Sequence, residues 1–211
     1  MARIGHGKPA EPPARPRAGA RERIDRTAYA LFSRHGVRAV GVDRIVARSG
    51  VAKMTLFRHY PTKDRLALSF LRRREELWVR AWLQGEVERR AGDAAERLLA
   101  IFDAFDEWFR RKDFEGCSFI RLLLEFDRRG HPVHVATVRH LEAIRSFLKQ
   151  LATDAGIVEA DRFSRQWQIL MMGSIVAAIE GDRDAALHAR HLGTFVLASA
   201  GRRRARKRSR Q

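Results

Sequence analysis

The 211-residue chain contains a single cysteine and no asparagine. With only Cys117 available, it can form neither an intrachain disulfide nor a zinc site built on cysteines. The absence of asparagine excludes N-linked glycosylation and Asn-Gly hairpin turns. The longest stretch without a charged residue, Gln166 to Ile179, has 14 residues, fewer than the roughly 20 that a membrane span needs. Charges from Lys8 to Arg17 also interrupt any signal-peptide core, so we expect a cytoplasmic protein that does not enter a membrane.

The sequence also lacks catalytic signatures. No G-x-S-x-G, Walker or dinucleotide-binding motif occurs, so we expect neither an enzyme nor a cofactor. His131, His134 and His140, with Glu142 nearby, could suggest a metal site. Their spacing is not that of an HExxH motif, however, and histidines at a helix start, with no metal, are the favoured interpretation. Cys117 is more consistent with a packed apolar side chain than with a redox sensor, because no second cysteine exists.

Positive charge is concentrated in the N-terminal third of the chain and at the C-terminus. Lysine and arginine total 42 against 25 aspartates and glutamates, a net charge of +17. Residues 1–20 carry +3, residues 21–65 carry +7 and residues 201–211 carry +7, whereas residues 66–200 hold twenty charges of each sign. This segregation predicts that one region binds a polyanion such as nucleic acid, while the neutral body has another role.

Apolar residues recur at helical spacing along most of the chain. Residues 1–20, which contain four prolines, are predicted to be a disordered basic arm, and residues 201–211 a disordered basic tail. Between them we expect a helix ending at Gly36, two short helices before Pro61, and a long helix capped by Thr62. Further helices are expected after Asp93 and from Asp161, with each aspartate as the cap of its helix, over residues 118–129, from Pro132, and from Asp182 or Asp184. The prediction is an all-α protein of about nine helices.

The two short helices and the helix before them have the order of a helix-turn-helix. A turn at Ser49-Gly50-Val51 separates the short helices, and the second would enter the major groove of DNA. Apolar positions in both can face inward, while basic residues fall in or beside them. These basic residues are Arg44, Arg48, Lys53, Arg58, His59 and Lys63.

The residues from Gly50 to Leu66, preceded by Val42-Asp43-Arg44-Ile45-Val46, resemble the DNA-binding domain of the TetR family of transcriptional regulators. The match holds in residue type and order over about residues 21–70. A second segment, Gly116 to Ile120, is similar to one found in the ligand domains of one branch of that family. The resemblance implies a three-helix DNA-binding domain at residues 21–65 and a helical ligand-binding and dimerisation domain at residues 66–200.

The resemblance also implies roles for individual residues. Tyr60 and Lys63 would contact phosphates, and residues 53–58 would lie in the groove. The implied DNA-binding set is Arg44, Lys53, Met54, Thr55, Phe57, Arg58, His59, Tyr60 and Lys63. Gly41 and Ala52 depart from the family pattern, because many relatives have there, or next to Gly41, hydroxyl residues that cap a helix. The departures put the phosphate bonds of such hydroxyls in question, and arginines are the candidates to compensate.

Large aromatic residues are concentrated in the neutral body. They could form ordinary core, but rings packed among helices also line apolar ligand cavities. The resemblance favours such a cavity, for a small-molecule effector of apolar or aromatic character. The expected lining is Trp78, Trp82, Phe102, Phe105, Trp108, Phe119, Trp167 and Met171.

Small and apolar residues occur together on the last two expected helices. They could again be core, or they could form a two-fold, four-helix interface with a second copy of the chain, which the resemblance favours. The expected interface residues are Ser174, Ile175, Ala178, Ala189, Leu192, Phe195 and Val196.

These features predict a homodimeric, sequence-specific transcriptional regulator that is associated with the nucleoid. We expect it to be a repressor, which a small molecule releases from a pseudo-palindromic operator. The helix from Thr62 is expected to transmit effector binding, because it begins beside the DNA-binding domain and continues through Trp78 and Trp82. The alternative is an architectural protein that binds any duplex through its basic arm and tail. Its affinity would fall steeply with salt and disappear without residues 201–211.

Overall fold

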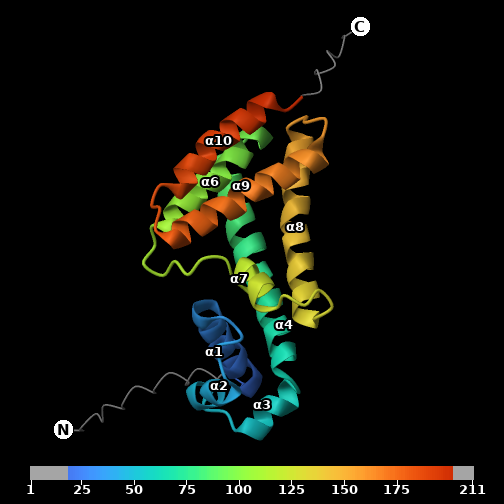
Figure 1. Ribbon diagram of the computed structural model, residues 1–211. Helices are drawn as coiled ribbons and strands as arrows, with labels where there is room; N and C mark the ends of the chain where they lie inside the picture. The colour runs from blue at the N-terminus through green and yellow to red at the C-terminus, as the bar shows by residue number, and fades with distance from the viewer. Residues whose placement is uncertain (1–18, 202–211) are drawn as a thin grey trace, which may run out of the picture.

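The computed structural model describes residues 19–201, and over that range the chain is built from helices (Figure 1). The continuous helical run from Lys63 to Arg90 counts as one helix, which gives nine helices within the described residues. The prediction of an all-α protein with about nine helices is therefore confirmed. Residues 1–18 and 202–211, on which the predictions of a disordered arm and tail almost entirely rest, lie outside the described part.

Three helices form an N-terminal unit: α1 (Ala20–His35), α2 (Val42–Ser49) and α3 (Lys53–His59). Gly36 ends α1 with a φ of 80°, and Gly50 ends α2 with a φ of 62°, backbone conformations that favour glycine. The unit has its own core, because each helix buries the apolar side of its sequence pattern. The buried side chains include Ile24, Ala28, Leu31, Phe32, Ile45 and Leu56.

A long helix leads from the N-terminal unit into the rest of the molecule (Figure 1). It consists of α4 (Lys63–Arg74), a π-helical stretch η1 (Glu75–Gln84) and α5 (Gly85–Arg90). As predicted, Thr62 caps it, since its hydroxyl oxygen accepts a hydrogen bond from the Arg65 N–H at 3.2 Å. α4 packs against α1 on one side and against α8 on another, so it contacts both halves of the chain.

The remaining helices form the body: α6 (Ala94–Phe109), α7 (Ser118–Glu125), α8 (Pro132–Asp154), α9 (Ala160–Glu180) and α10 (Ala185–Ser199). α9 packs against both α8 and α10, and α6 packs against α10 and α8 (Figure 1). The predicted cap at Asp93 is confirmed, because its carboxylate accepts hydrogen bonds from the N–H groups of Ala95 and Glu96 at 2.8 and 3.2 Å.

Two predicted helix boundaries were wrong, one at the end of α7 and one at the start of α9. α7 stops at Glu125 instead of Arg129, because the backbone turns out of the helix at Phe126, whose buried ring packs 4.8 Å from the ring of His131. Asp161 lies inside the first turn of α9 and does not cap it. Its carboxylate is instead paired with Lys149 and Arg165, at 3.3 and 3.1 Å.

The structure adds two findings about absent features. Among residues 19–201, no helix is both long enough and apolar enough to cross a lipid bilayer. In the same range, no three histidine, cysteine, aspartate or glutamate side chains come together in a way that could hold a metal ion.

Candidate nucleic-acid interface and adjoining cleft

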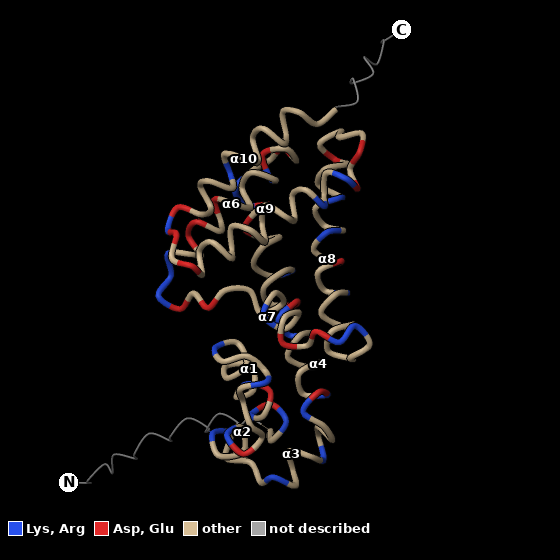
Figure 2. Tube along the Cα trace, viewed as in Figure 1, with Lys and Arg blue, Asp and Glu red and all other residues tan. Residues whose placement is uncertain are grey.

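The exposed side of the N-terminal unit carries most of the residues expected to bind DNA. Leu56 packs α3 against the core of the unit and is 2% exposed, whereas Met54 on the same helix is 76% exposed. Lys53, Arg58 and His59 also lie at the surface. Figure 2 shows basic residues gathered around α2, α3 and the start of α4. A short helix thus presents a basic surface of the kind that enters a major groove.

Several of these basic groups have partners within the chain. The Lys53 ammonium pairs with Asp43 at 2.8 Å, and Arg44 lies 3.2 Å from Nε2 of His35. Lys63 donates to the Arg38 carbonyl at 3.2 Å, and partial burial lowers the pKa of its ammonium. Such exposed bonds are weak, so phosphate oxygens can replace them at little cost.

Tyr60 is placed differently from the rest of the expected set. Its side chain is only 4% exposed, and its hydroxyl donates to the Asp25 carboxylate and lies 3.3 Å from the Ser69 hydroxyl. Phe57 is also partly buried. The ring that the resemblance assigns to a phosphate therefore joins α1 to α4 in this structure.

The predicted pocket residues divide into two groups. Trp78, Trp82 and Trp108 lie on a cleft, with ring centroids 5.2–5.7 Å apart. The other members are buried in the body, where Phe102 and Trp167 pack against each other at 5.4 Å. The residues that pack inside the body and do not line this cleft are Phe102, Phe105, Phe119, Trp167 and Met171.

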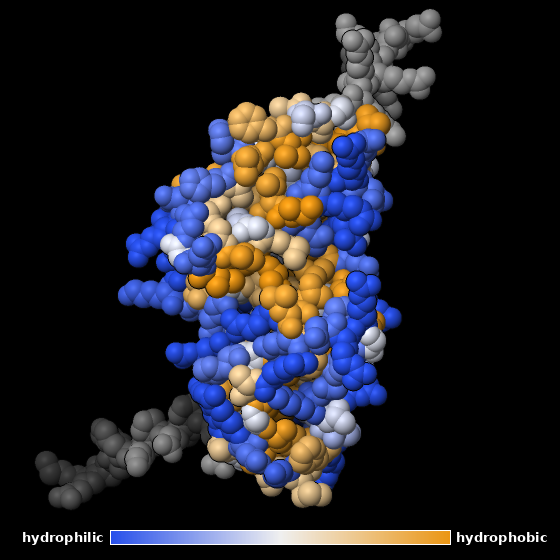
Figure 3. Space-filling model, viewed as in Figure 1, coloured by the Kyte–Doolittle hydropathy of each residue, from blue (hydrophilic) through white to orange (hydrophobic). Residues whose placement is uncertain are grey.

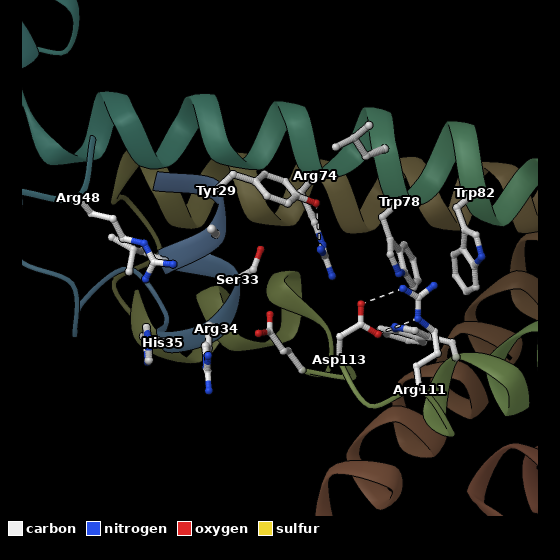
Figure 4. A pocket seen from close by; sticks show the side chains of 15 residues that line it. Tyr29, Ser33, Arg34, His35, Arg48, Arg74, Trp78, Trp82, Arg111 and Asp113 are labelled. Atoms are coloured by element: carbon white, nitrogen blue, oxygen red, sulfur yellow. Dashed lines mark hydrogen bonds and ion pairs between the residues drawn. The ribbon is translucent and has the colours of Figure 1, made fainter. Parts of the chain in front are cut away.

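The cleft has a volume of about 610 Å³ and lies between the N-terminal unit and the body (Figure 4). One wall is α1 from Tyr29 to His35, and Arg48 of α2 closes that end. The long helix supplies Arg74, Leu77, Trp78 and Trp82, while α6 and the segment after it supply Trp108, Arg111, Asp113 and Glu115. The polar residues of the cleft could not be predicted from the sequence, because they come from separate segments that share no periodic pattern.

A second link between the N-terminal unit and the body is made by α7. Arg121 donates to the carbonyls of Ser33 and Arg34 at 2.8 and 3.1 Å, which caps the end of α1. Glu125 accepts from the N–H groups of Val37 and Arg38 at 2.8 and 3.0 Å. One short helix therefore holds both sides of the turn that follows α1.

The expected interface residues on α9 and α10 are partly inside the molecule. Ser174, Ile175 and Ala189 are no more than 5% exposed, so they belong to the core of the chain. Leu192 and Phe195 are 52% and 60% exposed, and Ala178 and Val196 are half-buried. Other exposed apolar residues on these helices, which the sequence pattern did not single out, are Ile169, Val176, Ile179 and Leu187. Figure 3 shows apolar surface on the body.

Cys117, in the segment that resembles a family ligand domain, is buried just before α7. Burial raises the pKa of its thiol, which keeps the thiol protonated and poorly reactive. This placement agrees with a packing role.

Comparison with known families decides what kind of protein this is. The model of bacterial regulatory proteins of the tetR family matches residues 24–70, and the tetracyclin repressor-like C-terminal domain matches residues 94–192. The chain belongs to the TetR family of transcriptional regulators. As a TetR-family protein it is a DNA-binding regulator and not an enzyme, as predicted.

Other TetR-family proteins are similar over most of the chain. The HTH-type transcriptional regulator YjdC of Escherichia coli (strain K12) is 23% identical over 158 residues, which is 74% of this chain and 81% of YjdC. The HTH-type transcriptional activator FasR of Mycolicibacterium smegmatis is 29% identical over 173 residues, 80% of this chain and 73% of FasR. The crystal structure of a TetR-family regulator from Streptomyces coelicolor matches with a TM-score of 0.79 at 27% identity, covering 86% of this chain and 89% of that one.

Proposed function

We propose that this TetR-family chain is a homodimeric repressor that binds a pseudo-palindromic operator and leaves it when a small molecule binds between the N-terminal unit and the body. The observation that carries the proposal is the position of the cleft. Its walls include α1 and α2 of the DNA-binding unit as well as the long helix and the body. A ligand there contacts both parts at once, so it can favour one relative placement of them over another.

The route from ligand to DNA is short. α1 carries Ser33 and His35 on the cleft, and the turn after α1 is held by Glu125 of α7. α4 begins at Lys63, beside α3, and passes directly into the π-helical stretch with Trp78 and Trp82. A ligand that binds one placement better weakens DNA binding by the same factor by which DNA weakens ligand binding.

Dimerisation through α9 and α10 is supported by their exposed apolar side chains. Phe195 and Leu192 on α10 and Val176 and Ile179 on α9 lie on two helices packed against each other. Two copies of such a pair form a four-helix interface with two-fold symmetry. The two α3 helices would then enter major grooves about 34–36 Å apart.

The test is selection of bound sites from random duplex DNA at about 150 mM salt, with the full chain and a chain ending at residue 200 in parallel. Both proteins should enrich the same palindrome, because α3 and the dimer set the specificity. If neither protein enriches any sequence, and DNA binding is lost without residues 201–211, the architectural alternative is established.

The sign of regulation needs its own experiment. FasR is an activator, whereas we propose repression, since an operator-bound dimer can simply block a promoter. A reporter placed behind the selected site should be expressed less when the chain is supplied. Higher expression would make the chain an activator and leave the DNA-binding proposal intact.

A further inference from the structure

The cleft between α1, the long helix and the segment after α6 has two chemically different ends (Figure 4). Three of the four tryptophans of the chain, Trp78, Trp82 and Trp108, form one end. At the other end, Arg74 points from α4 into the space that the Ser33 hydroxyl faces from α1 (Figure 4). The cleft volume of about 610 Å³ lies in the range of small-molecule sites.

Two buried polar atoms on the cleft lack a hydrogen-bond partner among the described residues. They are the Ser33 hydroxyl oxygen and the Trp78 indole nitrogen, on side chains of residues that are 7% and 8% exposed. Buried polar groups in folded proteins nearly always have a partner, and an unpaired one calls for an explanation. An indole N–H can only donate. Both groups can therefore donate to an acceptor located in the cleft.

The charges around the cleft favour an anion. Its lining has four guanidinium groups, on Arg34, Arg48, Arg74 and Arg111, against the carboxylates of Asp113 and Glu115. Arg111 and Asp113 already satisfy each other through two hydrogen bonds of 2.8 Å, which lower the pKa of Asp113.

Arg74 uses one of its donors on the Tyr29 hydroxyl, at 3.0 Å. A guanidinium has five N–H donors, so others of Arg74 are available to a ligand. Charge-assisted bonds from a guanidinium to a carboxylate are strong and directional.

We propose that the cleft binds an organic carboxylate with an apolar body, its carboxylate on Arg74 and Ser33 and its body against Trp78 and Trp108. This inference rests on the proposed function and names the chemical class of the effector. The opposite class is a cation held over the indole faces, which cation–π attraction would favour. The excess of arginines on the same lining opposes that class, because it raises the cost of a positive ligand.

Calorimetry on the full-length protein without DNA tests the charge of the ligand. The probes are naphthalene-2-carboxylate and octanoate, each with its primary amide, together with a naphthylmethyl-trimethylammonium cation. Each acid should bind at least about tenfold more tightly than its amide, as expected for one charge-assisted contact of about 1.4 kcal/mol. Equal binding of acid and amide, tighter binding of the cation, or no binding of either acid below about 1 mM would overturn the proposal.

Two variants test the position of the carboxylate. Arg74→Gln should abolish the preference for the acid over the amide, whereas Arg73→Gln, at the next position and outside the cleft lining, should keep it. Ser33→Ala removes an unpaired buried hydroxyl, so the variant should fold normally. It should bind both acids severalfold more weakly than the unchanged protein. An unchanged preference in Arg74→Gln, with normal circular dichroism, would contradict the assignment.

Fluorescence and DNA binding separate the inference from the proposed function. Octanoate does not absorb where tryptophan does, so its binding at Trp78 and Trp108 should change the tryptophan emission directly; unchanged emission during octanoate binding would contradict the placement. Binding of the selected duplex is measured first without any acid, and failure there rejects the proposed function alone. Specific duplex binding together with failure of both acids rejects only the assignment of the cleft.

Discussion

The carboxylate of Glu125 accepts a hydrogen bond from the backbone N–H of Val37 at 2.8 Å, across 88 positions of the sequence. The same oxygen accepts from the N–H of Arg38 at 3.0 Å. Val37 directly follows Gly36, which ends α1, and Glu125 is the last residue of α7. α7 of the body is therefore hydrogen-bonded directly to the backbone between α1 and α2.

Glu125→Ala should lower the free energy of unfolding by about 1–2 kcal/mol, because it leaves the Val37 N–H, on a buried residue, without its acceptor. Urea denaturation measures this loss. Hydrogen exchange should also become faster at residues 37 and 38. Glu142→Ala is the control, since that carboxylate is exposed on α8 and lies 3.8 Å from its only ion-pair partner among the described residues, Arg145. Equal stability of the two variants would show that the contact contributes nothing.

Gly36 and Gly85 should respond to alanine in opposite directions. Gly36 has a φ of 80°, and a Cβ there would lie 1.8 Å from Oε1 of Glu125, so Gly36→Ala should destabilise the protein by at least about 1 kcal/mol. Gly85 has helical dihedral angles and open space around it, so Gly85→Ala should stabilise by about 0.5–1 kcal/mol. Thermal unfolding of both variants checks the signs, and a neutral Gly36→Ala would contradict the argument.

The helices and their starts could be read from the sequence because their signals are local. Thr62 and Asp93 were predicted as caps and accept the expected hydrogen bonds. Where a side chain had a distant competitor the prediction failed: Asp161 is paired with Lys149 on another helix and does not cap α9.

The cleft could not be predicted in the same way. Trp78 and Trp167 are the same residue type in similar helical patterns, yet one lines the cleft and the other is fully buried beside Phe102. Ser33 and Arg74 line the same cleft only because α1 packs on α4, which no spacing in the sequence records. The exposed face of α9 was missed for the same reason, since helical periodicity shows that a face is apolar and not what covers it.

Arg58→Ala should weaken operator binding while leaving the fold and the proposed dimer intact. Arg58 is exposed near the end of α3 and makes no ion pair among the described residues, so its loss removes contacts to DNA only. At about 1–3 kcal/mol for each base contact and two copies per dimer, affinity should fall roughly 30-fold or more. Fluorescence anisotropy with the selected duplex measures the effect. Arg139→Ala, an exposed arginine on α8, is the control, and equal affinity of the two variants would remove Arg58 from the interface.

His35 should titrate below its ordinary value of 6.5, because desolvation and then the guanidiniums of Arg44 and Arg34 lower the pKa of its imidazole. The unfolded chain then binds more protons between the two pKa values. Stability should therefore fall as the pH drops from above 6.5 through the pKa of the folded state. NMR titration, with His35→Gln for assignment, measures this pKa. Arg44→Gln should raise it and shrink the loss of stability, whereas Arg48→Gln should not; a pKa unaffected by Arg44→Gln would disprove the electrostatic cause.

Phe195→Glu should convert the proposed dimer to monomers if α9 and α10 form its interface. Phe195 is 60% exposed on α10, and a two-fold interface would place its ring, or the new carboxylate, in an apolar contact. Within one chain the new side chain points outward, so the fold should survive, as circular dichroism can confirm. Sedimentation velocity measures the mass of the variant. Its operator affinity should also be lower, because the single α3 of a monomer contacts only half of a palindrome. Leu124→Glu, at a residue 76% exposed on α7, is the matched control. A Phe195→Glu protein that stays dimeric would place the interface elsewhere on the body.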